Sequence, residues 1–229
     1  MFKWIKRILP FGKKEFTPEE LEALYEAEEK GLEKILGPID DVVGHALIPF
    51  QVGGAVDMYY FSKHLPGTVF ATIELINPDG TGPKPNRIGT YELMTCTKLK
   101  RNPESKETYQ ERNKRVGEGR LTPFEEMECR MKGIMTSIGF YSFDAVIQPG
   151  ETAELPLDDN ETVPLVFDEY STPENPFQIN GKRHGLLLIM EIFPSELEYA
   201  RNNGSGALFE KLKAQGVYPY SDLDRQPVI

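Results

Sequence analysis

The spacing of hydrophobic residues predicts two long helices. Residues 17–36 place hydrophobic side chains at intervals of three and four, and their first four residues combine an N-cap threonine, a first-turn proline and a capping-box glutamate. A second Thr-Pro-x-Glu sequence at Thr122 opens a Met-rich hydrophobic stripe, which Gly139 is expected to end. We interpret this stripe as a helix packed on a sheet, and the alternative is a soft, Met-rich binding face.

Hydrophobic runs of a different kind predict β-strands between and after these helices. The expected strands cover residues 56–61, 69–76, 90–99, 140–147, 163–167 and 185–193. The last run, GLLLIMEIF, is almost entirely hydrophobic, which is typical of a central strand buried on both faces. Two short helices follow it, the first opened by a predicted capping box of Ser195 and Glu198 and the second over residues 207–214. This order predicts an α+β fold, with helices packed on a mixed, mainly antiparallel β-sheet.

Two polar segments carry charge of opposite sign and are the predicted partner-binding surfaces. Residues 100–120 hold seven basic and four acidic residues without hydrophobic periodicity, so we expect a long exposed excursion. Residues 151–175 hold eight acidic residues and no basic one, and the alternative for them is a role in solubility alone. The candidate binding residues are Asp158, Asp159 and Glu161 in the acidic segment, and Arg112, Lys114 and Arg115 in the other.

Residues 1–14 form a basic arm ahead of a single domain that we expect over residues 15–229. The arm carries five positive charges and no negative one, and its hydrophobic residues gather on one helical face. Such a segment can lie on an anionic membrane through Phe2, Trp4 and Ile5, or in a groove of a partner. Because proline stops the helix after nine residues, we favour an arm that packs on its own domain or extends into solvent.

Composition narrows the classes of function. The 229 residues suffice to bury a sizeable core, and the net charge of −10 argues against nucleic-acid binding, because an acidic surface repels phosphates. Two cysteines do not make a disulfide framework, and no stretch has the length of a membrane span or the hydrophobic core of a signal peptide. We therefore expect a cytoplasmic protein.

Few residues indicate a catalytic, metal-binding or cofactor-binding site. The three histidines lack the spacing of metal ligands, and Cys96 and Cys129 fall within predicted elements, where buried, inert thiols are expected. A nucleophile elbow, a phosphate-binding loop and a dinucleotide fingerprint are all missing. We therefore expect no metal, no cofactor and no enzyme activity. The alternative is a hydrolase-like enzyme with a His/Asp site, in which His45, Asp57 and His64 meet.

One stretch of the chain has a specific order of motifs. A buried strand over residues 186–193 runs into a helix start at 195–197, an Asn203-Gly204 break and a Leu-rich helix at 208–212. Three weaker features precede it in a fixed order. These are a strand at 56–61, the run from Tyr91-Glu92-Leu93 to Lys98–Arg101, and the helix at 123–138. Taken together, residues 38–229 resemble the suppressor of fused family.

The resemblance implies a compact α+β domain that binds other proteins. Animal members hold a transcription factor between this domain and a second one, and we expect this chain to correspond to the first domain alone. Residues 69–75 also lack the Trp and His that the family has in this strand, so transcription-factor binding does not carry over. Some single-domain bacterial members have been proposed as immunity proteins that neutralise toxins. We expect a non-catalytic protein-interaction domain whose partner is another protein, with a basic toxin as one candidate.

Overall fold

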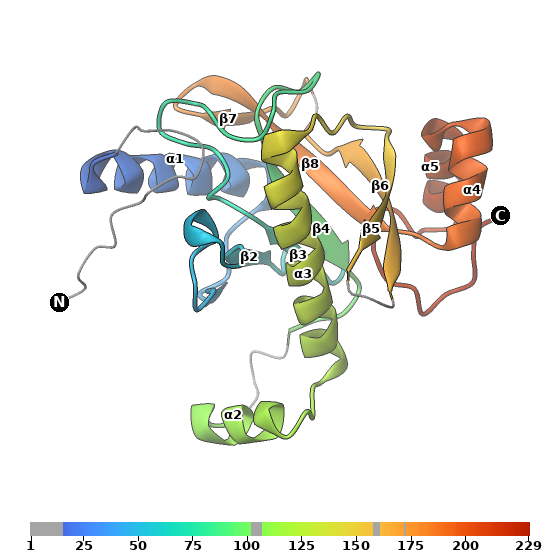
Figure 1. The fold of residues 1–229 in the computed structure, drawn as a ribbon, viewed down its shortest axis with the longest axis horizontal. Helices are drawn as coiled ribbons and strands as arrows, with labels where there is room; N and C mark the ends of the chain where they lie inside the picture. Colours follow the sequence, from blue (N-terminus) through green and yellow to red (C-terminus); the bar gives the residue numbers. More distant parts are fainter. Residues whose placement is uncertain (1–15, 102–106, 158–160, 172) are drawn as a thin grey trace.

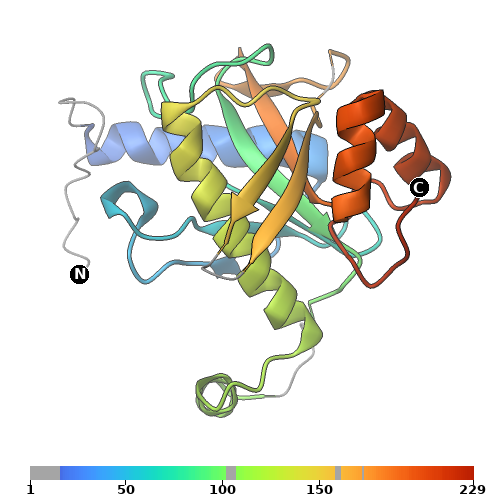
Figure 2. The same ribbon diagram turned by 45° about the vertical axis from the view of Figure 1, so that its right-hand side comes forward.

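The computed structural model describes residues 16–101, 107–157, 161–171 and 173–229, in which helices pack on a single β-sheet (Figures 1 and 2). The helices are α1 (Pro18–Leu36), α2 (Tyr109–Gly117), α3 (Pro123–Asp144), α4 (Pro194–Asn203) and α5 (Ser205–Ala214), with a 3-10 helix, η1, at Phe50–Val52. The strands are β1 (Val43–Gly44), β2 (Met58–Phe61), β3 (Thr68–Ala71), β4 (Tyr91–Thr97), β5 (Thr152–Pro156), β6 (Thr162–Glu169), β7 (Phe177–Ile179) and β8 (Lys182–Glu191). The basic arm lies outside the described residues.

The sheet confirms the predicted α+β fold with a mixed, mainly antiparallel sheet. Its strand order is β1-β2-β3-β4-β8-β6-β5, and β7 pairs with the start of β8. Only the β4–β8 pair is parallel among these pairings. From His184 on, every residue of β8 is buried, which confirms the predicted central strand. Gly185 permits the parallel pairing, because a Cβ there would lie 2.4 Å from the side chain of Ile88.

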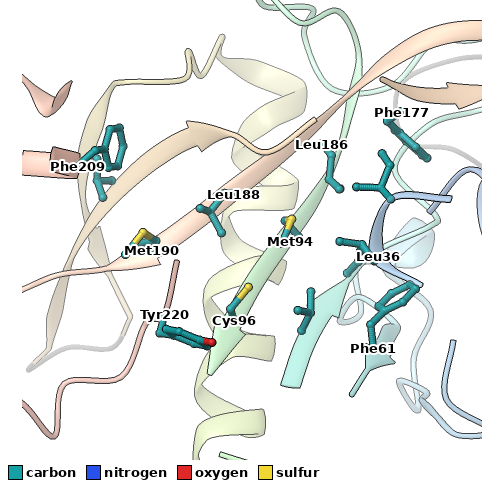
Figure 3. Packing of buried hydrophobic residues seen from close by; sticks show 14 of the residues in the cluster. Leu36, Phe61, Met94, Cys96, Phe177, Leu186, Leu188, Met190, Phe209 and Tyr220 are labelled. Atoms are coloured by element: carbon teal, nitrogen blue, oxygen red, sulfur yellow. The ribbon is translucent and has the colours of Figure 1, made fainter. Parts of the chain in front are cut away.

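Helices α1, α4 and α5 cover one face of the sheet. Helix α1 begins with the predicted capping box, in which the Glu20 carboxylate and the Thr17 hydroxyl accept hydrogen bonds from each other's backbone N–H. Figure 3 shows the hydrophobic layer beneath, with Leu36 and Phe209 toward opposite sides and Leu188 between them. Burying each such side chain stabilises the fold by about 1.5–3 kcal/mol.

Helix α3 covers the opposite face and is longer than predicted. Its stripe is buried in a second hydrophobic cluster, which confirms the helix packed on a sheet. The prediction that Gly139 ends the helix and that a strand covers residues 140–147 is wrong. The backbone at Gly139 stays helical, and the ring of Phe50 fits against it, 3.2 Å from where a Cβ would lie. The same ring stacks on Phe140 at 4.3 Å, so packing outweighs the low helix propensity of glycine.

The polar segment 100–120 is partly helical, which corrects the prediction of an unstructured excursion. Helix α2 begins at a third capping box, made by Thr108 and Glu111. The sequence shows this pair, but the prediction relied on hydrophobic periodicity, which α2 lacks. Its described side chains join neither hydrophobic cluster.

Strand β3 ends at Ala71, although the pattern predicted a strand to Ile76. The chain turns instead around the carboxylate of Glu92 on β4. This carboxylate accepts hydrogen bonds from the backbone N–H groups of Leu75 (2.9 Å) and Ile76 (2.8 Å) and from the hydroxyl of Thr72 (2.5 Å). Glu92 is fully buried, and burial raises its pKa to about 7 against the lowering effect of these hydrogen bonds.

The segment after α5 completes the centre of the sheet. The β4–β8 pairing stops at Met94 and Leu188, and Tyr220 then lies beside Cys96 in parallel orientation (Figure 3). The buried hydroxyl of Ser221 accepts a hydrogen bond from the backbone N–H of Glu191, at 3.2 Å. The segment thus bridges the two central strands beyond the end of their own pairing.

Helix α4 fixes the end of this segment. At the start of this helix the Glu196 carboxylate accepts a hydrogen bond from the Phe193 backbone N–H, at 3.0 Å. The predicted capping box of Ser195 and Glu198 is therefore wrong. The same fully buried carboxylate binds both terminal nitrogens of Arg225, at 2.6 and 2.9 Å. One side chain therefore holds the helix start and the C-terminal segment together.

Candidate interaction surfaces

Helix α2 projects from the sheet layers and is held to the first turn of α3 by ion pairs (Figure 1). The guanidinium of Arg115 donates to Glu125 at 2.7 Å and to Glu107 at 2.8 Å, and Arg112 donates to Glu125 at 3.0 Å. The hydrogen bond from Arg115 holds the pKa of the Glu125 carboxyl well below its usual range. Two of the three predicted basic binding residues thus fasten α2, while Lys114 is exposed.

The acidic segment folds mainly as the antiparallel pair β5–β6, and several of its carboxylates have partners within the protein. Glu161 lies 2.6 Å from Arg130 on α3, whose guanidinium also binds the buried Glu191 at 2.5 Å. Glu154 pairs with Arg201 at 2.7 Å. The other two predicted binding residues, Asp158 and Asp159, lie outside the described residues.

The residues of the alternative His/Asp site only partly meet. The Nδ1 atom of His45 lies 2.7 Å from the Asp57 carboxylate, whose other oxygen accepts from the Ala46 backbone N–H. His64 instead lies 2.7 Å from the hydroxyl of Tyr170, and burial lowers its pKa. Among the described residues, no group of three or more His, Cys, Asp and Glu side chains is arranged to hold a metal ion.

The two thiols differ in environment. Cys96 is fully buried in the central sheet, and burial raises its pKa, as expected for an inert thiol. Cys129 is exposed on α3, which corrects the expectation that both thiols are buried. The hydrophobic stripe of α3 lies on another side of the helix, so the position within the helix did not decide burial.

A hydrophobic loop lies exposed around η1. Phe50 points inward against α3, which turns its neighbours outward: Leu47 is fully exposed, Ile48 is 59% exposed and Val52 is 49% exposed. Clustered hydrophobic side chains in contact with water are typical of protein–protein contact surfaces. No helix in the described part of the chain has the length and hydrophobicity needed to cross a membrane.

Known proteins resemble this chain in structure, whereas comparisons of sequence found no match. No protein-family model matches the sequence, and no curated protein matches it. A crystal structure of the Sufu-Fu complex superposes with a TM-score of 0.54 at 14% identity, over 91% of this chain and 92% of that chain. A suppressor of fused homologue from Neisseria gonorrhoeae superposes with a TM-score of 0.53 at 11% identity, over 91% of this chain and 98% of that chain. The chain has the suppressor of fused fold.

The suppressor of fused fold accounts for the motif order found in the sequence. The strand–helix–break–helix block is β8, α4 and α5, and the break at Gly204 has φ 87°, a value that favours glycine. At 11–14% identity the two structures show a shared fold, and the roles of individual residues need separate arguments.

Within this suppressor of fused fold, β1, α2 and the start of α3 surround a cavity of about 580 Å³. Its lining comprises residues 42–44, 99–101, 122–125, Tyr60, Glu107, Arg112, Arg115 and Glu128. The hydroxyl of Tyr60 donates to Glu128 near the start of α3, and burial, together with this hydrogen bond, raises the pKa of Tyr60. No binding role was assigned to Tyr60 or Arg101 from the sequence, although the Lys100-Arg101 pair directly follows a predicted strand.

Proposed function

We propose that this suppressor-of-fused-like domain acts by binding another protein and is not an enzyme. The observation that carries the proposal is the fold, which is shared with a protein solved in the Sufu-Fu complex. The exposed loop around η1 supports it, because Leu47 and Ile48 present hydrophobic surface that a partner would bury. Two thiols without a disulfide between them support a cytoplasmic location.

The test is affinity purification of the tagged full-length protein from its own cells. A matched pair of variants locates the contact: Leu47→Asp with Ile48→Asp in the loop, and Val146→Asp, also exposed, as control. We expect the wild type and the control to retain the same partner, and the loop variant to lose it. Equal recovery by the loop variant and the control would exclude the loop as the contact surface. Recovery of no protein beyond an unrelated tagged control would contradict protein binding.

The finer proposal is an immunity protein whose acidic face, around Asp158, Asp159 and Glu161, neutralises a basic toxin. The net charge of −10 supports it, since opposite charge speeds the encounter of two proteins. Because Glu161 pairs with Arg130, its reversal would disturb the fold as well as the face. The informative variant is therefore Asp158→Lys with Asp159→Lys, and Lys114→Glu is its control. We expect the first to slow association at low salt; no change in association rate would overturn the acidic face.

The hydrolase-like alternative rests on one contact, the 2.7 Å approach of His45 to Asp57. A carboxylate at Nδ1 can orient an imidazole for acid–base chemistry. Hydrolysis of a generic ester panel that is lost in His45→Ala and retained in His64→Ala would favour the enzyme. Activity at buffer level in wild type and both variants would favour the binding domain.

A further inference from the structure

The cavity beside α2 is more positive than the protein around it. Four cationic side chains line it against three carboxylates, on a chain whose net charge is −10. Each of these carboxylates has a partner within the protein. Arg115 binds both Glu107 and Glu125, and the Tyr60 hydroxyl donates to Glu128. The hydroxyl does not neutralise Glu128, so the lining carries one net positive charge, and the cations without a carboxylate partner supply it.

Those cations are Lys100 and Arg101, which directly follow β4. Among the described residues neither forms an ion pair with a carboxylate. The guanidinium carbon of Arg101 lies 5.9 Å from the centre of the Tyr60 ring, so the aromatic face positions the charge while its N–H groups stay available. Arg115 binds Glu107 and Glu125, and among the described residues Arg101 forms no ion pair with Glu128, the third carboxylate of the lining.

Most of the remaining lining is hydrophobic. Val42, Val43, Leu99 and Phe124 supply side-chain surface, and Val42 is 40% exposed although it is aliphatic. The volume falls within the range of about 300–1,000 Å³ found for pockets that hold small ligands. A ligand that matches both halves of the lining has a negative group next to a compact hydrophobic group.

We propose that this cavity is a binding site for a carboxylate that carries a hydrophobic group. The carboxylate pairs with Arg101 and Lys100, and the hydrophobic group contacts Leu99 and Phe124. The same chemistry is available from a free aliphatic acid or from an acidic residue or chain end of a protein partner. Neither the hydrophobic loop nor Glu161 contributes a residue to the described lining, so the site extends the proposed function without depending on either.

The experiment titrates the 15N-labelled full-length protein with four probes and follows amide chemical shifts. Hexanoate represents the free acid and N-acetyl-leucyl-glutamate with an amidated C-terminus represents the protein source; hexanamide and N-acetyl-leucyl-glutamine with an amidated C-terminus are their neutral counterparts. We expect saturable shifts at residues 42–44 and 99–101 with an acid, and at least tenfold weaker binding by its neutral counterpart. Response to hexanoate alone assigns a free acid, and response to the peptide alone assigns a protein source.

Matched variants separate charge from folding. Arg101→Gln should weaken binding of the acid at least tenfold, whereas Arg101→Lys should retain most of it. Lys98→Gln is the control, because Lys98 belongs to the same strand end but lies over Tyr220 and outside the cavity lining. The absence of shifts with both acids would overturn the site. Equal binding of each acid and its neutral counterpart, or unchanged binding of the acid by Arg101→Gln, would overturn the role of the cations. Neither result bears on the purification test of protein binding.

Discussion

The buried carboxyl of Glu92 makes the stability of the protein depend on pH in a way that one substitution should remove. Its pKa of about 7 in the folded protein lies above its ordinary value of 4.5. The folded protein therefore binds this proton more tightly than the unfolded chain does. The contribution is fully present below pH 4.5 and is lost as the pH rises through about 7. A difference of this size corresponds to about 3 kcal/mol.

Glu92→Gln keeps the shape of the protonated acid and cannot ionise. Its amide oxygen can accept from the backbone N–H groups of Leu75 and Ile76, and its NH₂ group can donate to the hydroxyl of Thr72, which also accepts from the Leu93 N–H. The substitution should therefore cost little at pH 5. At pH 8 the variant should be more stable than the wild type, because only the wild type must bury a charged carboxylate.

Urea unfolding of both proteins at pH 5, 6.5 and 8 measures this difference. Groups away from Glu92 titrate alike in the two proteins, so the free energy of unfolding of the variant minus that of the wild type reports Glu92 together with its repulsion from Glu74. We expect this difference to grow by about 2.5 kcal/mol between pH 5 and pH 8, because the contribution is already slightly reduced at pH 5. A difference that stays constant with pH would refute the reasoning, and so would one that shrinks as the pH rises.

Further predictions follow from other contacts. Arg130→Met removes the cation that pairs with Glu191, a side chain that is only 2% exposed. Urea titration should therefore show a loss of about 3–5 kcal/mol in the free energy of unfolding, whereas the control Glu161→Gln should lose much less. A thiol reagent should label one equivalent, Cys129, in the native protein and a second, Cys96, only in urea; two fast equivalents would contradict the burial of Cys96. A chain that starts at Glu15 should melt within a few degrees of the full chain, and a large drop would place the Phe2/Ile5/Leu9 face in the core. Elemental analysis should find no bound metal, and near-stoichiometric zinc would disprove that prediction.

The sequence predicted elements whose signals are local. The Thr17 and Thr122 helix starts and the two-sided burial of β8 need only neighbouring residues. The β7–β8 hairpin was also readable, since its turn is Asn180-Gly181 with φ 50° and 78°, but it was not predicted. Local chemistry therefore sufficed for most of the fold class.

The failures arose where distant residues decide the structure. Gly139 remains helical because the ring of Phe50, some ninety positions earlier, fits against it. Strand β3 stops early because Glu92 captures the following backbone N–H groups. The cavity could not be predicted either, since it joins Tyr60 of β2 to residues of α2 and α3 that share no sequence motif. Likewise, spacing gave no sign that Arg112 and Arg115 would be tied to Glu125.

The segment around Ser221 has a consequence for synthesis of the protein on the ribosome. Thr97 at the end of β4 donates to Asp222, a residue 125 positions later, and Tyr91 pairs in parallel with Gly185. A nascent chain that has emerged only as far as α3 therefore holds β4 with one unpaired edge. Long-range pairing of this kind forms slowly and exposes strand edges to aggregation. We expect the emerging chain to need protection by chaperones until residues 185–222 have been made.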